Sequence, residues 1–166
     1  MTLMDAPKYD AARARRHLRM AYSFTAGFVI LLIAAWFIVG RPIDYPWTWV
    51  TYWTGQRTTQ QFLVAVENNN LPKAYGIWVD DPEWQHHPEK FKTYDFDRFQ
   101  QDWGSNSTAN DYGAFTSHKV VVTKLWGNSL IVGSMINGRK SKPLFLAYDP
   151  KAHTLGYSPV ELTIDR

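Results

Sequence analysis

The chain has 166 residues, 16% of them aromatic, and a formal net charge of +3 at neutral pH. It contains no cysteine, which excludes disulfides, thiolate metal sites and cysteine nucleophiles. Residues 1–41 hold six lysines and arginines against two aspartates, net +4, so residues 42–166 sum to −1. A nearly neutral domain lacks the positive surface with which proteins bind nucleic acids, and we expect no nucleic-acid partner.

An uncharged run of twenty residues, AYSFTAGFVILLIAAWFIVG, occupies residues 21–40. As a helix it would extend about 30 Å, the thickness of the hydrocarbon core of a bilayer. A secretory signal peptide would have a shorter apolar core and a small-residue cleavage site, whereas this run continues into Arg41 and Pro42. A buried core helix would carry a polar stripe. The sequence therefore predicts an uncleaved transmembrane helix over residues 20–40.

Lysines and arginines are distributed unequally on the two sides of this run. Five lie within residues 1–19, and two, Arg41 and Arg57, lie in the twenty residues that follow it. This asymmetry predicts a basic cytoplasmic tail over residues 1–19 and an exported C-terminal part, in the cytoplasmic (inner) membrane. We expect basic residues at the inner lipid interface and aromatic residues at the outer one, namely Arg15, Arg16, Arg19, Trp36, Trp47, Trp49 and Trp53.

Residues 41–56 are an aromatic juxtamembrane segment. Trp and Tyr prefer the headgroup level, where an apolar ring and a polar tip are both accommodated. Pro42 and Pro46 argue against one helix running through the segment. We expect it to lie on the bilayer or to pack against the exported domain, which we place at residues 57–166.

Three helices are predicted in the first half of that domain. Residues 58–61 (TTQQ) have the spacing of a capping box, which places the start of the first helix at Thr58. The second begins at Leu71, after three asparagines and with a proline in its first turn. Residues 79–94 are polar and are expected to form a loop. A third helix is predicted to start near Asp95 and to stop at Gly104.

The second half of the domain changes character and predicts strands. They are expected over residues 117–126, 129–137, 144–148 and 154–164. Gly127 and Asn128 have the composition of a two-residue hairpin turn, and Pro159 predicts a bulge or an edge in the last strand. Helices followed by an antiparallel meander indicate the α+β class, with the helices covering one face of a curved sheet.

This order of elements, over roughly residues 57–164, resembles the cone-shaped fold of the nuclear-transport-factor-two-like superfamily, also called cystatin-like. The helix pair QQFLVAVENNNLPKAYGIW resembles the common opening of that superfamily. The resemblance implies a cone-like sheet that serves either as a ligand-binding or enzymatic cone or as an assembly module. No strand is predicted between the second and third helices, which departs from the pattern. No catalytic signature matches, so no functional residue is transferred.

The densest polar stretch is DDPEWQHHPE, residues 80–89, with two histidines and four carboxylates. A divalent metal needs ligands that converge, and adjacent histidines in a loop broken by prolines diverge. No other metal-binding spacing is present, and we predict neither a metal nor another cofactor. The stretch is expected to be a solvated loop, or a loop that binds a partner with Trp84 as its anchor.

General acid–base chemistry is a second possibility, because an apolar cavity can shift the pKa of an enclosed carboxyl or imidazole group. No motif places a catalytic residue, and we predict none. Asp97 and Asp102 are expected to face water on the third helix. The candidates for proton transfer are Tyr75, Tyr94, Asp97, Asp102 and His118.

The function predicted is protein–protein contact by the exported domain, as an accessory or assembly module whose partner is a membrane protein or a second copy. The alternative is a cone that binds a small apolar ligand, with isomerase- or hydrolase-like activity. A cone filled by Phe96, Phe99, Trp103 and Trp126 would favour the first, and a hollow cone the second. The candidate residues for binding a ligand or a partner are Tyr75, Trp78, Trp84, Phe96, Phe99, Trp103 and Trp126.

Overall fold

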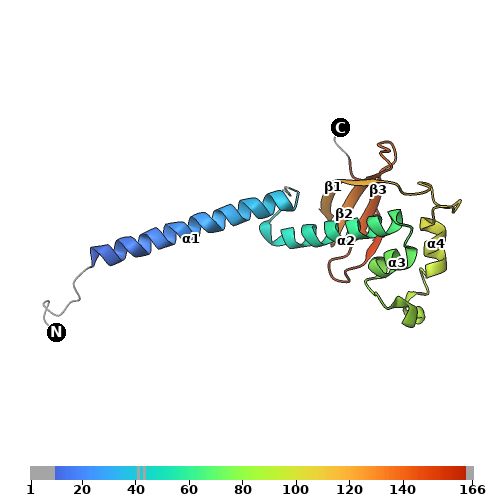
Figure 1. Cartoon of the computed structure of the whole chain (residues 1–166), viewed down its shortest axis with the longest axis horizontal. Coiled ribbons are helices and arrows are strands. Elements are labelled where there is room, and N and C mark those ends of the chain that lie inside the picture. Colours follow the sequence, from blue (N-terminus) through green and yellow to red (C-terminus); the bar gives the residue numbers. More distant parts are fainter. Residues whose placement is uncertain (1–9, 41, 43, 164–166) are drawn as a thin grey trace. The chain divides into compact units, whose positions relative to one another are not determined.

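A computed structural model describes residues 10–40, 42 and 44–163 of the chain, which divides into two compact units, residues 1–41 and 42–166 (Figure 1). Residues 1–9 of the predicted basic tail and Arg41 lie outside the described residues. The first unit contains the helix α1 (Ala11–Ile38). The Asp10 carboxylate caps it by accepting hydrogen bonds from the backbone N–H groups of Ala12 and Arg13, at 3.0 and 3.1 Å.

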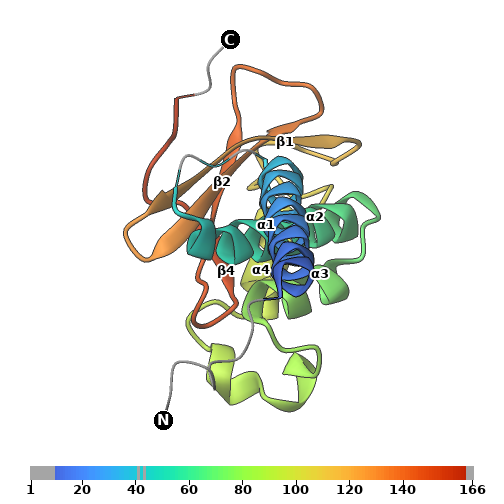
Figure 2. The same cartoon turned by 90° about the vertical axis from the view of Figure 1, so that its left-hand side faces the viewer.

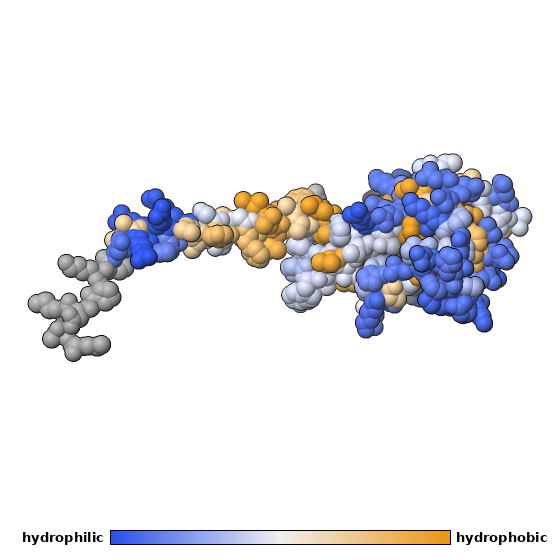
Figure 3. All heavy atoms as spheres, turned by 60° about the horizontal axis from the view of Figure 1, so that its bottom comes forward, coloured by the Kyte–Doolittle hydropathy of each residue, from blue (hydrophilic) through white to orange (hydrophobic). Residues whose placement is uncertain are grey.

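The arginines of the first turns and the apolar run belong to this one helix. Figure 3 shows the hydrophilic start of α1 followed by an apolar band. No described residue of α1 is buried, and large apolar side chains such as Phe24 (75% exposed) and Leu31 (69% exposed) have no protein cover. The helix is long and apolar enough to cross a membrane, and a signal sequence near the N-terminus would share both properties.

The second unit begins with three helices, α2 (Trp49–Glu67), α3 (Leu71–Val79) and α4 (Phe96–Trp103), and with the short 3₁₀ turns η2 (Pro46–Thr48), η3 (Trp84–His86) and η4 (Pro88–Phe91). The predicted starts of the second and third helices are confirmed. Asn70 caps α3 by accepting from the N–H of Lys73, and Asp95 caps α4 by accepting from that of Arg98. Gly104 follows α4 as predicted, but with extended backbone.

The predicted start of the first helix is wrong, because α2 begins at Trp49 and not at Thr58. Its buried stripe runs unbroken from Tyr52 through Gly55 and Thr59 to Phe62, so the residues before Thr58 are helical and no cap is needed there. The prediction that no single helix runs through Pro42 and Pro46 is confirmed. α1 ends at Ile38, and between α1 and α2 the described residues form only the short turn η2.

Within the described residues, four antiparallel strands form one sheet in the order β1 (His118–Trp126), β2 (Ser129–Ile136), β3 (Leu144–Tyr148) and β4 (Leu155–Tyr157). The protein is therefore of the α+β class. Gly127 and Asn128 join β1 to β2 as predicted, with Trp126 opposite Ser129. The prediction of a long last strand over residues 154–164 was wrong. β4 ends at Tyr157, before Pro159, because proline lacks the backbone N–H that pairing with a neighbouring strand requires. Its expected end, residue 164, lies outside the described residues.

The helix α2 lies directly on the sheet, and Gly55 makes this close approach possible. A Cβ atom at Gly55 would be 2.6 Å from Cδ2 of Leu130 on β2 and 2.8 Å from the ring of Tyr148 on β3. Figures 1 and 2 show α2 crossing one face of the sheet, and α3 packs against α2.

Aromatic side chains fill the space between these helices and the sheet. We call Phe62, Tyr75, Trp78, Phe99 and Trp103 the aromatic core; each is at most 6% exposed. The rings of Phe62 and Trp103 meet edge to face with centroids 4.8 Å apart, and those of Tyr75 and Phe99 lie 5.2 Å apart. One ring comes from α2, two from α3 and two from α4. The core therefore fastens the three helices to one another.

Candidate functional site

A groove of about 510 Å³ lies on the surface of the second unit, between α2, α3 and the loop that follows α3. Its volume is that of sites which accept a small ligand or a few side chains of a partner. Apolar and polar side chains both line it. We call it the Trp84 groove; its lining residues are Thr58, Gln61, Pro72, Lys73, Gly76, Ile77, Asp80, Pro82, Trp84 and Gln85.

The side chain of Trp84 lines this groove and is held in place by contacts within the unit. Its indole N–H donates to the carbonyl oxygen of Pro72 at 3.2 Å. Its ring meets Tyr75 edge to face, with centroids 4.8 Å apart, and lies tilted on Phe96 at 4.6 Å. The sequence predicted Trp84 either in a solvated loop or as an anchor for a partner. The structure gives it three intramolecular contacts, so its position needs no partner to be fixed.

The loop beside Trp84 is held by its own polar contacts. The carboxylate of Asp81 lies 2.8 Å from Nδ1 of His87 and accepts from the N–H of Glu83 at 2.9 Å. The hydrogen bond with His87 lowers the pKa of Asp81 below its usual value. Gly76 lets the loop approach α3, because a Cβ there would be 3.2 Å from the Asp81 carbonyl oxygen. The groove is thus formed before anything binds it.

The histidines and carboxylates of this loop do not converge. Among the described residues, no group of three His, Asp or Glu side chains is placed to hold a metal ion. Asp81 and His87 pair with each other, while Glu83 and His86 are exposed. The contact between Asp81 and His87 holds the loop in shape.

Tyr94, Asp102 and Tyr157 form a polar cluster that ties α4 to β4. Both tyrosine hydroxyls donate to Oδ2 of Asp102, at 2.9 and 3.2 Å, and they lie 3.1 Å apart. The expectation that Asp102 faces water is wrong, since its side chain is only 22% exposed and Arg98 lies 3.7 Å from its other oxygen. Because Tyr157 comes from β4, the helix-face pattern alone could not reveal this cluster.

The same cluster raises the pKa values of its tyrosines. Burial, followed by the contacts with Tyr157 and Asp102, raises the pKa of Tyr94. About half of Tyr157 is exposed, but desolvation of its hydroxyl end raises its pKa to about 12. Both hydroxyls stay protonated at neutral pH and donate to the carboxylate. The cluster therefore joins α4 to β4 through hydrogen bonds.

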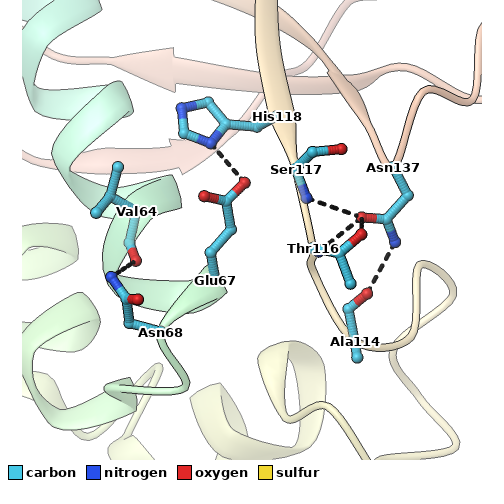
Figure 4. A network of polar contacts seen from close by, with 8 residues as sticks. All are labelled: Val64, Glu67, Asn68, Ala114, Thr116, Ser117, His118 and Asn137. Carbon is cyan, nitrogen blue, oxygen red and sulfur yellow. Dashed lines mark hydrogen bonds and ion pairs between the residues drawn. The ribbon is translucent and has the colours of Figure 1, made fainter.

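The structure does not bring the remaining acid–base candidates together. Asp97 is exposed, as predicted, and the Tyr75 hydroxyl donates to the Tyr94 carbonyl oxygen at 2.7 Å. His118 lies at the start of β1, where its Nδ1 is 2.7 Å from Oε1 of Glu67 on α2 (Figure 4). The side chains of His118 and Glu67 are 15% and 20% exposed, so this contact joins a helix end to a strand end.

Asn137, which the sequence did not single out, organises the neighbouring turn (Figure 4). Its Oδ1 accepts from the backbone N–H groups of Thr116 and Ser117 at 2.8 and 3.3 Å, and its Nδ2 donates to the Ala114 carbonyl at 2.8 Å. Its backbone is left-handed, with φ of 52°, a conformation that asparagine tolerates. The following Gly138 was the available signal for a turn.

The predicted binding residues separate into three environments. Four of them, Tyr75, Trp78, Phe99 and Trp103, belong to the aromatic core. Phe96 and Trp84 are half-buried against each other beside the groove. Trp126 is 52% exposed at the end of β1 and takes no part in filling the interior. Of the four residues expected to fill the interior of a cone, Phe99 and Trp103 are buried in the aromatic core, whereas Phe96 is half-buried and Trp126 is exposed.

The residues predicted to lie at the lipid interfaces come from both units of the chain. Arg15, Arg16 and Arg19 are in the first half of α1, Trp36 is near its end, Trp47 is in η2, and Trp49 and Trp53 are in α2.

Comparison of this chain with protein-family models, with curated proteins and with solved structures finds no match. The resemblance to the nuclear-transport-factor-two-like superfamily therefore stays a prediction, and any function has to be argued from the residues of this chain.

Proposed function

We propose that this chain is a single-pass protein of the cytoplasmic membrane whose exported unit, residues 42–166, is a protein-interaction or assembly module. The observation that carries the proposal is the filled interior of the second unit beside a preformed surface groove. Phe62, Trp78 and Trp103 are buried there and their rings pack against one another.

The membrane anchor is supported by α1. Its uncovered Phe, Leu and Ile side chains carry an apolar surface that lipid would cover and water would not. The five lysines and arginines that precede the uncharged run, against two that follow, favour a cytoplasmic N-terminus and an exported second unit.

The Trp84 groove is the surface that we assign to the partner, a membrane protein or a second copy. Its apolar wall, made by Pro72, Ile77 and Trp84, suits one or two apolar side chains of a partner segment. Lys73 and Gln61 at the groove supply charge and hydrogen bonds for orientation. Because the loop is already held in place, binding needs little ordering of this side.

The alternative function, a cone for a small apolar ligand with isomerase- or hydrolase-like activity, has two observations against it. The aromatic core occupies the interior, and Tyr94 and Asp102 hydrogen-bond to each other. A general base in such a site would need a carboxylate with free lone pairs aimed into a cavity.

Fractionation and a reporter test the anchor. The full chain should stay with membranes until detergent is added, and a periplasmic reporter fused after Arg166 should be active while a cytosolic one is not. Release without detergent, or activity of the cytosolic reporter alone, would overturn the anchored topology.

Site-specific photo-crosslinking tests the interaction module. A photoreactive phenylalanine analogue at Gln61 or Lys73 should give one discrete adduct with a membrane protein or a second copy. The matched control is the same analogue at Lys140, an exposed lysine in the turn between β2 and β3. Equal adducts from all three positions, or none from the groove in cells that express the chain, would contradict the proposal.

A further inference from the structure

η2 and the start of α2, which follow the predicted span in the sequence, present an exposed apolar stripe. Trp47, Val50 and Trp53 follow one another at helical spacing and are 73%, 68% and 44% exposed. Tyr45 stacks on Trp47, with ring centroids 4.5 Å apart and planes 5° from parallel. The Thr48 hydroxyl donates to the Tyr45 carbonyl at 2.6 Å, which holds the turn that presents the pair.

A segment far away in the sequence reaches the same end of the unit. The N–H of Leu125 donates to the Tyr52 hydroxyl at 3.3 Å, and the Gln56 amide donates to the Thr123 hydroxyl at 3.1 Å. β1 thus runs along α2 towards its first turn, and the β1–β2 turn lies beside the start of α2 (Figure 2). Trp126, at this turn, is 52% exposed.

These residues lie at the same end of the second unit, and we call them the aromatic end: Tyr45, Trp47, Val50, Trp53 and Trp126. Because the Thr123 side chain contacts Gln56 of α2, the side chain of Trp126 lies on the opposite face of β1, so the set belongs to one end of the unit and not to one face. Basic groups accompany it. The Arg57 guanidinium lies 5.2 Å from the centroid of the Trp53 ring, and Lys124, two residues before Trp126 on the same face of β1, is exposed. Exposed Trp and Tyr beside cations are the chemistry that suits an anionic headgroup layer.

The covalent tether limits how far this surface can be from the span. Tyr45 follows Ile38, the last residue of α1, by seven residues, which extend to at most about 25 Å. We propose that the second unit docks on the headgroup layer through the aromatic end, with the β1–β2 turn inserted beside the start of α2. This inference rests on the proposed membrane anchor and adds an orientation for the exported unit.

The absence of cysteine from the chain makes a clean test possible. Single cysteines are introduced in the full chain at Asn128 in the β1–β2 turn, at Val50 in the aromatic end, at Ser141 in the turn between β2 and β3, and at Leu31 in α1. Each variant carries a nitroxide label and is reconstituted, one chain per nanodisc, in phosphatidylglycerol-containing lipid. Collisions with oxygen and with a water-soluble nickel chelate then report the depth of each label.

The docked orientation predicts that the labels at 128 and 50 collide with the nickel chelate several-fold less than the label at 141, while remaining accessible to oxygen. Trp126→Ser should restore chelate access at 128, and Lys124→Glu should do so in anionic but not in neutral nanodiscs. A label at 128 as water-accessible as that at 141, while 31 reports lipid, would overturn the docking and leave the anchor intact.

Two further outcomes separate this inference from its competitors. Protection of 128 from both oxygen and the chelate would mean a protein contact at the aromatic end, and it would overturn lipid docking. Access of the nickel chelate to the label at 31 would contradict the membrane anchor, and with it both the proposed topology and the proposed docking.

Discussion

The same aromatic residue types occur in two contrasting regions of the second unit. In the aromatic core, Phe62, Trp78 and Trp103 are 0%, 6% and 3% exposed and pack at fixed ring angles. In the aromatic end, Trp47 and Trp126 are 73% and 52% exposed. Aromatic content alone therefore does not distinguish a folding core from a contact surface; the elements that surround each ring do.

The difference has an energetic consequence. A ring of the core has left water and touches neighbours on all sides, so its removal loses transfer free energy and leaves a cavity. A ring of the aromatic end has most of its area still to bury, on lipid or on another surface. Substitutions in the aromatic core should therefore change the free energy of unfolding, whereas substitutions in the aromatic end should change the attachment of the unit to lipid or to another surface.

The largest expected effect comes from Phe62→Ala. Phe62 is fully buried and contacts rings from α3 and α4, so we expect a loss of about 3–5 kcal/mol in the free energy of unfolding. Denaturant titration of the full chain in detergent, followed by near-ultraviolet circular dichroism, measures it. The matched control, Trp47→Ala, should change stability by about 0.5 kcal/mol or less. Equal losses for both variants would contradict the division into two regions.

A second contrast uses two glycines. Gly55→Val places atoms where Leu130 and Tyr148, both fully buried, already lie, and we expect a loss of about 2–3 kcal/mol. Gly156→Val on β4 adds a side chain with no atom within 4 Å of its Cβ, and its effect should stay within about 0.5 kcal/mol. Thermal unfolding of both variants measures the difference. A neutral Gly55→Val would mean that α2 does not lie on the sheet as described.

Local patterns predicted much of this fold from the sequence. The helix starts at Leu71 and near Asp95 and the turn at Gly127 are set by neighbouring residues, and each lies where the pattern placed it. The start of α2 was missed because the TTQQ spacing imitates a cap, although the stripe through Tyr52 and Gly55 continues upstream.

The site was less predictable, because its contacts join distant segments. Tyr157 meets Asp102 across 55 residues, and Leu125 meets Tyr52 across 73. Trp126 could equally have filled the interior, since the strand pattern does not state which face a helix will cover. The position of its hairpin beside α2 needed the tertiary structure.

The pH dependence of stability tests the junction between the two regions, where Tyr52 lies. Burial, and then its hydrogen bond to Asp44, raise the pKa of Tyr52 from 10.0 to about 12. The folded pKa is the higher one, so the neutral hydroxyl contributes fully below pH 10, and this contribution is lost as pH rises from 10 to 12. We expect Tyr52→Phe to cost about 1–2 kcal/mol at neutral pH.

Comparison of the variant with the parent isolates Tyr52 from other tyrosines that titrate at high pH. The stability of Tyr52→Phe, from denaturant titrations at pH 7 to 12, should fall less steeply above pH 10 than that of the parent. Tyr45→Phe, an exposed tyrosine of the same segment, should keep the parent's slope. If the stability of Tyr52→Phe and that of the parent fall with the same slope above pH 10, the loss of stability at high pH does not come from Tyr52.

The smallest expected effect is a gain in stability, and it tests whether the interior around Thr59 is apolar. Thr59 is fully buried on α2, and its hydroxyl has no hydrogen-bond partner among the described residues. Thr59→Val keeps the shape and replaces the unpaired hydroxyl by a methyl group, so stability should rise by about 1 kcal/mol in the same titration. Thr58→Val, on the partly exposed side of the same turn, should change little. A loss at Thr59 would show that its hydroxyl is hydrogen-bonded in solution, and that this part of the interior is polar where the structure makes it apolar.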